Sequence, residues 1–298
     1  MGSIIIDGKP IRITNPKKLL WPELGIRKID YVAILMRLAP HLIKHAANRL
    51  LTAIRYPDGI NGKSFYQKNV PASAPVWIDV NKYNDTNYML LNSQATLAYL
   101  ANQAVLEFHT AFNLYTNEAF PTDLVFDLDP SSGQSFTEVT EAALLIHETL
   151  DSLGIKGWVK TSGATGLQIY IPLGEKYTYE TARQINYFFG RYLSTKHPNL
   201  ITIERIVKKR GSRVYFDYLQ MWSGKTIMLV YSPRATPQAN VSTPVEWEEL
   251  QSGVKPEDFN LLNIEERIKQ KGDLFAPLLD NAYNQNLDTV LAYSAKFP

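Results

Sequence analysis

Hydrophobic residues recur along this chain at two spacings, and each spacing predicts one type of secondary structure. A repeat of three and four residues is typical of a helix with one buried face. This repeat covers residues 28–46, 93–107 and roughly 178–194. A further helix is expected after the capping box Ser135-Phe-Thr-Glu138, and Gly154 ends it.

Runs of β-branched and aromatic residues between these helices predict strands. The expected strands cover residues 3–6, 10–14, 50–57, 64–68, 123–129, 158–160, 168–171, 201–207, 213–219 and 226–232. The tail, residues 248–298, reads as mostly helical and loop-like. We expect an α/β fold of mixed sheets with helices outside. Because no repeat or long linker interrupts the chain, we expect a single domain over residues 1–298.

The run Asp123-Leu-Val-Phe-Asp-Leu-Asp-Pro130 is the most informative chemical feature of the sequence. Residues two apart on a strand point to one face, so Asp127 and Asp129 are expected to project side by side. Two such carboxylates repel each other unless a cation neutralises them. Mg²⁺ or Mn²⁺ would do so and would also accept phosphate oxygens. With Asp217 as a third carboxylate, the pattern predicts a two-metal site for phosphoryl transfer.

Other polar segments fit a nucleotide, and each has a plainer alternative. The loop from Ser162 to Gly166 could offer backbone N–H groups and hydroxyls to phosphates, or form only a tight hairpin. Cations near the Asp217 strand would hold a triphosphate or form a structural ion-pair network; they are Arg210, Arg213, Lys225 and Arg234.

An aromatic pair and a histidine are further candidates. Phe65 or Tyr66 could stack on a base with Lys68 at a phosphate, although core packing is the safer interpretation. His109 could bind a triphosphate or be a buried histidine with ordinary partners.

Composition indicates a globular protein and leaves the partner open. The chain is 45% hydrophobic and 20% charged, with a net charge of only +2. It has no cysteine, which excludes a disulfide framework and fits a reducing cytosol. We find no secretory signal and no apolar run near the roughly 18 residues of a membrane span. Positive charge is concentrated at Lys17-Lys18, Arg27-Lys28 and Lys208-Lys209-Arg210, each of which could also be solvated surface.

Taken together and in order, these motifs resemble the polymerase domain of bacterial ligase D. That domain is the non-homologous end-joining member of the archaeo-eukaryotic primase superfamily. The likeness runs from about Thr14 to about Trp247. The motifs that carry it are Thr14-Asn-Pro-Lys-Lys-Leu-Leu-Trp-Pro22, Arg55-Tyr-Pro-Asp-Gly59, Ser64-Phe-Tyr-Gln-Lys68, Leu124-Val-Phe-Asp-Leu-Asp-Pro130, Thr161-Ser-Gly-Ala-Thr-Gly166, Val214-Tyr-Phe-Asp-Tyr-Leu-Gln220, Lys225-Thr226, Tyr231-Ser-Pro-Arg234 and Val241-Ser-Thr-Pro244.

The resemblance implies a primase-like fold with largely antiparallel central sheets. It also implies a nucleotidyltransferase that extends DNA ends with nucleoside triphosphates, using two Mn²⁺ or Mg²⁺ ions. The implied metal ligands are Asp127, Asp129 and Asp217. The implied nucleotide-binding residues are Phe65 or Tyr66 at the base, with Lys68, His109, Ser162, Gly163, Thr165, Gly166, Gln168, Arg210, Gln220, Lys225 and Arg234. Lys18 and Lys28 match residues that hold the 5′-phosphate of a DNA break.

The sequence departs from the family pattern at two places. Gln168 stands where the family has a histidine, and Thr165 replaces a lysine of some members. Strand alternation suggests that Gln168 faces the nucleotide beside Ser162, where a neutral amide would bind phosphate more weakly than an imidazolium. The Lys-x-Asp-Gly motif of a ligase is absent, so we expect a separate ATP-dependent DNA ligase as a partner. A Ku-like protein is a further candidate partner, whose binding the sequence leaves open.

Two other functions compete with a cytoplasmic, nucleoid-associated end-processing polymerase. One is a binding module that recognises 5′-phosphorylated ends or nucleotides without turnover, which the Gln168 substitution favours and the three carboxylates disfavour. The other is a primase that starts chains de novo.

Overall fold

The computed structural model describes residues 3–294, and the chain forms two compact units. The first unit contains the chain up to Ala111 together with Thr226–Ser242 and Phe259–Gly272. The second contains Phe112–Lys225, Thr243–Asp258 and the chain from Asp273 onward. The single domain over residues 1–298 stays a prediction, and the predicted tail, residues 248–298, contributes to both units.

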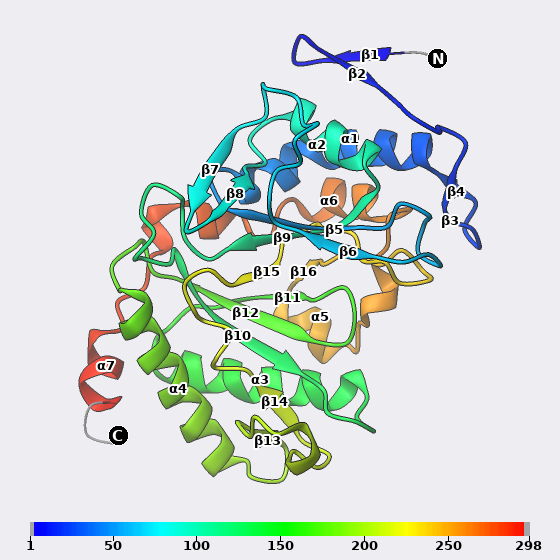
Figure 1. The fold of residues 1–298 in the computed structure, drawn as a ribbon. Helices are drawn as coiled ribbons and strands as arrows, with labels where there is room; N and C mark the ends of the chain where they lie inside the picture. Colours follow the sequence, from blue (N-terminus) through cyan, green and yellow to red (C-terminus); the bar gives the residue numbers. More distant parts are fainter. Residues whose placement is uncertain (1–2, 295–298) are drawn as a thin grey trace. The chain divides into compact units, whose positions relative to one another are not determined.

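A four-stranded antiparallel sheet organises the first unit (Figure 1). Its strand order is β15 (Thr226–Met228), β9 (Val105–Ala111), β5 (Leu51–Arg55) and β6 (Phe65–Gln67), which makes β6 an edge strand. The helices are α1 (Lys28–Ala46), α2 (Gln94–Asn102) and α6 (Ile264–Lys271). The phenol of Tyr31 on α1 donates to the carbonyl oxygen of Val105 at 2.6 Å, which ties this helix to β9. Three hairpins complete the unit: β1 (Ser3–Ile6) with β2 (Lys9–Arg12), β3 (Leu19–Trp21) with β4 (Ile26–Arg27), and β7 (Val80–Tyr83) with β8 (Thr86–Met89).

The second unit is built on a six-stranded sheet that contains the Asp-x-Asp strand at its centre (Figure 1). The order is β13 (Ile201–Thr202), β14 (Val214–Phe216), β10 (Asp123–Asp129), β12 (Leu167–Pro172), β11 (Trp158–Thr161) and β16 (Pro244–Val245). Only β13 and β14 pair in parallel; the other neighbours are antiparallel. The helices are α3 (Phe136–Ser152), α4 (Tyr179–Lys196), α5 (Trp247–Gln251) and α7 (Asp288–Ser294). Short 3₁₀ turns lie at η1 (Val207–Lys209), η2 (Pro256–Asp258), η3 (Ala276–Leu279) and η4 (Asn281–Tyr283).

The two faces of this sheet differ in chemistry. Phe126 of β10 packs against Phe189 of α4 and Phe216 of β14, with ring centroids 5.1 and 5.0 Å apart. The buried Asn186 of α4 donates to the carbonyl oxygen of Val125, which fixes the helix over β10. Because strand residues alternate between faces, Asp127 lies on the face opposite Phe126. The apolar core on one face thereby presents the polar residues of β10 on the other.

The mixed α/β fold with largely antiparallel sheets is confirmed. Helix α1 covers the predicted residues 28–46, and α3 begins at its capping box with Ser135 as N-cap. The predicted helix over 93–107 is wrong at its end, because Ala104 adopts a left-handed conformation (φ 56°) and the next residue begins β9. The predicted strands at 201–207, 213–219 and 226–232 are each shortened to two or three residues.

In residues 3–294, no helix is long and apolar enough to cross a membrane.

Candidate active site

Strand pairing brings the three predicted carboxylates onto neighbouring segments of the second unit. The backbone N–H of Asp217, just past β14, donates to the carbonyl oxygen of Asp127 at 2.9 Å. Asp129 pairs with Tyr215 two residues along the same two strands. Opposite residues of paired strands share a face, so Asp217, Asp127 and Asp129 emerge on one side of the sheet.

The electrostatics of Asp127 reflect this crowding. Burial, followed by the carboxylates of Asp129 and Asp217, raises the pKa of Asp127 to about 8. A hydrogen bond from Gln168 and the positive charge of Lys160 oppose the shift without cancelling it. A divalent cation beside these oxygens would remove the cause of the shift, because opposite charge favours the ionised carboxylate.

The carboxylate of Asp217 is engaged within its own turn. Its Oδ1 accepts hydrogen bonds from the Tyr215 hydroxyl at 3.1 Å and from the Leu219 N–H at 3.0 Å. Burial and the Asp217 charge raise the pKa of Tyr215, so its hydroxyl stays a donor. Within the described chain, no group of three acidic, histidine or cysteine side chains is arranged to hold a metal ion. The carboxylate oxygens are the type of ligand that a hard divalent cation prefers. The three carboxylates are not arranged around one common point here, and their joint binding of an ion stays a prediction.

The Ser162–Gly166 loop is a closed hairpin that packs against the carboxylate strand. Ser162 Oγ accepts from the N–H groups of Ala164 and Gly166, at 3.3 and 3.1 Å. A Cβ added at Gly166 would lie 2.6 Å from the carbonyl oxygen of Leu128 and 3.1 Å from Asp129 Oδ1. Glycine is therefore needed for the close approach of this loop to β10. The loop is therefore a tight hairpin that lies beside Asp129, and phosphate binding by its N–H groups and hydroxyls stays a prediction.

Gln168 is buried, with only 4% of its surface exposed. Its Nε2 donates to Asp127 Oδ1 at 3.0 Å, and its Oε1 accepts from the ammonium group of Lys160. The Gln168 side chain therefore lies on the sheet face of Asp127, as expected from strand alternation, and its position beside Ser162 in a nucleotide site stays a prediction. Both ends of the amide are used inside the sheet, and contact between Gln168 and a triphosphate stays a prediction.

The predicted cations of the second unit have local partners. The Arg210 guanidinium lies over the Tyr215 ring, 3.5 Å from its centroid, and donates to the carbonyl oxygen of Glu204. The exposed Lys225 donates to the Leu219 carbonyl oxygen at 2.9 Å, and Gln220 lies in the same turn as Asp217. These contacts hold the loops on either side of β14, and nucleotide binding by the same groups stays a prediction.

In the first unit, two predicted nucleotide ligands meet at one buried carboxylate. Glu107 Oε2 lies 3.5 Å from His109 Nε2 and 3.2 Å from the Arg234 guanidinium. Burial alone would raise the pKa of Glu107, but the hydrogen bond to His109 and the charge of Arg234 lower it overall. The Ala235 N–H and the Tyr56 hydroxyl also donate to Glu107. The carboxylate fixes His109 and Arg234 as a preformed polar pair.

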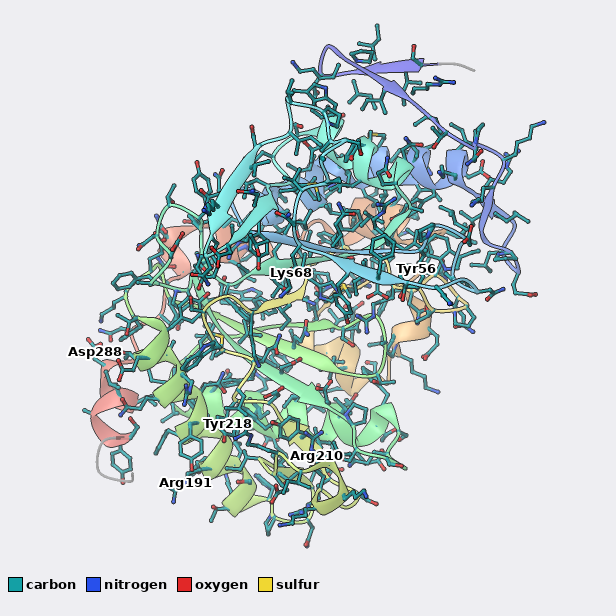
Figure 2. The ribbon with its side chains drawn as sticks, in the orientation of Figure 1. Tyr56, Lys68, Arg191, Arg210, Tyr218 and Asp288 are labelled. Carbon is teal, nitrogen blue, oxygen red and sulfur yellow. The ribbon has the colours of Figure 1, made fainter. Side chains whose placement is uncertain are left out.

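The register of edge strand β6 distinguishes the two aromatic candidates. Tyr66 pairs with Ile54, and Ile54 pairs with Glu107, so Tyr66 shares the sheet face of Glu107 and His109. Phe65 pairs with Arg55 on the other face, and the Arg55 guanidinium lies 5.2 Å from its ring centroid. The exposed Lys68 follows directly after β6 (Figure 2).

Lys18 and Lys28 have different environments in the first unit. Lys18 donates to the Asp58 carboxylate and to the Pro57 carbonyl oxygen, both at 2.8 Å. Lys28 is buried, and its ammonium donates to the Asn102 carbonyl oxygen at 2.8 Å. Burial and the nearby charges of Lys18 and Arg55 lower the pKa of Lys28. The predicted phosphate site is thus a real cluster of cations, although its binding of a phosphate stays a prediction.

Sequence reasoning missed Lys160, Glu107 and Tyr215, which hold the predicted residues in place. Strand alternation could have placed Glu107 with His109, since they are two residues apart. The partners of Lys160 and Tyr215 depend on strand register, which the sequence pattern does not specify.

A family model for the LigD primase-polymerase domain matches residues 27–275. The chain belongs to this family. Over 295 residues it is 34% identical to the bifunctional non-homologous end joining protein LigD of Bacillus subtilis, covering 97% of this chain and 48% of that protein. It is 31% identical to the multifunctional LigD of Mycolicibacterium smegmatis, covering 90% of this chain and 36% of that protein. The chain therefore spans less than half the length of these curated relatives.

One solved structure that this chain resembles is the polymerase domain of Mycobacterium tuberculosis Ligase D in complex with DNA. It matches with a TM-score of 0.83 and 28% identity, covering 90% of this chain and 97% of that chain. The resemblance drawn from the motifs is confirmed at the level of family and fold.

Proposed function

We propose that this chain is a DNA end-processing nucleotidyltransferase that extends the 3′ ends of broken DNA with nucleoside triphosphates. Membership of the LigD primase-polymerase family supports this class of reaction. The observation that carries the proposal is the set of three carboxylates on adjacent segments of one sheet, where burial and then the charges of Asp129 and Asp217 raise the pKa of Asp127 to about 8. Such a site favours divalent cations, and double-strand-break repair supplies the substrate.

Two Mn²⁺ or Mg²⁺ ions would be held by Asp127, Asp129 and Asp217. When bound, they would supply activation of the primer 3′-hydroxyl and charge stabilisation at the leaving pyrophosphate. For Asp217 to join the site, its carboxylate must exchange or share the hydrogen bonds from Tyr215 and Leu219. Gly166 keeps the Ser162 loop close to Asp129, where it would meet the triphosphate.

The first unit also carries predicted nucleotide-binding groups. Glu107 orients His109 and Arg234, and both carry donors suited to phosphate oxygens. Tyr66, on the same sheet face, is the better candidate for stacking on the base, whereas Phe65 is paired with Arg55. Lys18 and Lys28 would hold a 5′-phosphate at the DNA break. A Ku-like protein and an ATP-dependent DNA ligase activity would complete the repair reaction in the cytoplasm, at the nucleoid.

The test is primer extension on gapped duplex DNA with a 5′-phosphate, with Mn²⁺ and each nucleotide type. We expect the wild-type protein to add nucleotides to the primer. The rate of addition should fall at least ~100-fold in Asp127→Ala, because one metal ligand is removed. DNA-end binding, measured by fluorescence anisotropy, should survive in Asp127→Ala. Asp151→Ala, at the exposed C-terminal end of α3, is the matched carboxylate control and should extend normally.

Two results would favour the other functions. Wild-type protein that binds ends but adds no nucleotide in either metal would identify a binding module. Product formed on a template without any primer strand would identify a primase.

A further inference from the structure

A polar row crosses three neighbouring strands of the second unit. Asp127 of β10 pairs with Gln168 of β12, and Gln168 pairs with Lys160 of β11. Directly opposite residues on antiparallel strands share a face, so the three side chains stand in line. The sequence places these residues far apart, and only the strand register joins them.

The row is buried and its contacts are continuous. The Lys160 ammonium donates to Gln168 Oε1 at 2.5 Å, and Gln168 Nε2 donates to Asp127 Oδ1 at 3.0 Å. Lys160 has no exposed surface and Gln168 has 4%. The Lys160 ammonium also lies 5.9 Å from the centroid of the Tyr170 ring, on the same face. Burying the charged ammonium group of Lys160 costs folding free energy, which suggests that the residue has a specific role.

Donor and acceptor chemistry fixes the orientation of the central amide. An ammonium group only donates, so it must meet the amide oxygen whether the carboxyl at the other end is neutral or ionised. A carboxamide has an acceptor at one end and donors at the other, so it can bridge the two in one orientation alone. If the amide turned over, nitrogen would meet ammonium and oxygen would meet carboxylate. Lys160 therefore determines that Gln168 presents Nε2 to Asp127.

We propose that Lys160 is a positioning residue for Asp127 and acts through the amide of Gln168. This inference rests on the proposed function in treating Asp127 as a metal ligand. Through the row, Asp127 Oδ1 keeps one fixed donor, which restricts rotation of the carboxylate in the position next to Asp129 and Asp217. On this interpretation the glutamine of this chain serves the carboxylate and does not touch the triphosphate.

A purely electrostatic role for Lys160 makes the opposite prediction about metal affinity. If the ammonium acted only as a nearby positive charge, its removal would strengthen cation binding to Asp127. If it positions Asp127, its removal frees the amide and weakens cation binding even though a repelling charge is gone. The sign of the change in Mn²⁺ affinity therefore separates the two roles.

The experiment compares Lys160→Met, Gln168→Leu and the double variant with wild type. Free Mn²⁺ is measured by electron paramagnetic resonance, without DNA or nucleotide. We expect Mn²⁺ to bind each single variant several-fold more weakly, and kcat for nucleotide addition to fall roughly tenfold, as for removal of one hydrogen bond to a charged group. The KM for nucleotide should change less than twofold.

Because Lys160 acts through Gln168, the double variant should be no worse than either single variant. It also removes the buried charge together with its acceptor, so it can be measured even if a single variant fails to fold. Tighter Mn²⁺ binding in Lys160→Met or in the double variant would overturn the proposal. Reductions in kcat that multiply in the double variant would do the same. Wild-type protein that binds Mn²⁺ but adds no nucleotide would remove the proposed function, while the Mn²⁺ comparison would still test the positioning role.

Discussion

A raised pKa makes Asp127 largely a neutral group in metal-free protein at pH 7. Burial is the first cause, and the carboxylates of Asp129 and Asp217 add to it. The same residue accepts a hydrogen bond from Gln168, which favours its ionised form. Asp127 is thus expected to be protonated without metal and ionised when a metal ion is bound. Functional sites often contain such groups, whose burial lowers the stability of the folded protein.

The raised pKa of Asp127 predicts how the free energy of unfolding depends on pH. In the unfolded chain the Asp127 carboxyl ionises near its ordinary value of 3.8, but in the folded protein it ionises near 8. Unfolding therefore releases a proton between these values, so the Asp127 contribution to the free energy of unfolding falls as pH rises from about 4 to 8. Asp127→Asn lacks this penalty and should unfold at a higher temperature than wild type at pH 8 in chelator.

The difference between the two proteins should shrink toward pH 4, where both side chains are neutral. Added Mn²⁺ should raise the unfolding temperature of wild type more than that of Asp127→Asn, because ligands stabilise the state that binds them. Thermal unfolding followed by circular dichroism measures both effects. Equal unfolding temperatures of the two proteins at pH 8 in chelator would show that ionisation of Asp127 does not destabilise the folded protein.

At the scale of single elements, helices and the Asp-x-Asp strand are readable from sequence, but the partners of each strand are not. The spacing of apolar residues determines α1, and a capping box determines the start of α3. That Gln168 bridges Lys160 and Asp127 depends on strand register, which only tertiary pairing sets. The end of α2 is not predicted, because Ala104 adopts a left-handed conformation without glycine or asparagine to signal it.

The register of edge strand β6 predicts which of its aromatic rings stacks on the nucleotide base. Its register places Tyr66 on the face of His109 and Glu107, with Phe65 on the other face beside Arg55. Stacking of one base on an aromatic ring is worth about 1–3 kcal/mol. Tyr66→Ala should therefore raise the nucleotide KM roughly tenfold, and Phe65→Ala should change it less. Steady-state kinetics with purine nucleotides decide the order, and a larger effect at Phe65 would reverse our assignment of the stacking ring.

At the scale of the whole molecule, affinity for DNA cannot come from net charge, which is only +2. It must come from local groups of cations such as Lys18 and Lys28, whose charges influence each other in the first unit. Lys18 is held by Asp58, so a terminal phosphate would compete with a carboxylate for this ammonium group. Such competition favours a doubly charged phosphate over the singly charged phosphodiesters of intact DNA.

The corresponding prediction concerns discrimination between DNA ends. Replacing Lys18 and Lys28 together by glutamine should erase the preference for 5′-phosphorylated over unphosphorylated ends. The log–log salt dependence of binding should flatten by about one unit for each phosphate that the protein no longer neutralises. Lys17→Gln, at an exposed neighbouring residue, removes one positive charge outside the proposed site and is the control. If the double variant still discriminates as wild type does in anisotropy titrations, these lysines do not bind the end.

The composition of the two units has a consequence for synthesis on the ribosome. The chain passes between units after residues 111, 225, 242, 258 and 272. Strand β9 pairs with β15, and β11 pairs with β16, and in each pair the second strand is synthesised much later. Neither sheet is complete before these later strands are made. A nascent chain ending near residue 225 would therefore expose unpaired strand edges, which are sites of aggregation and chaperone binding. Neither unit can finish folding before residue 272 is synthesised, so the two are expected to mature together late in translation.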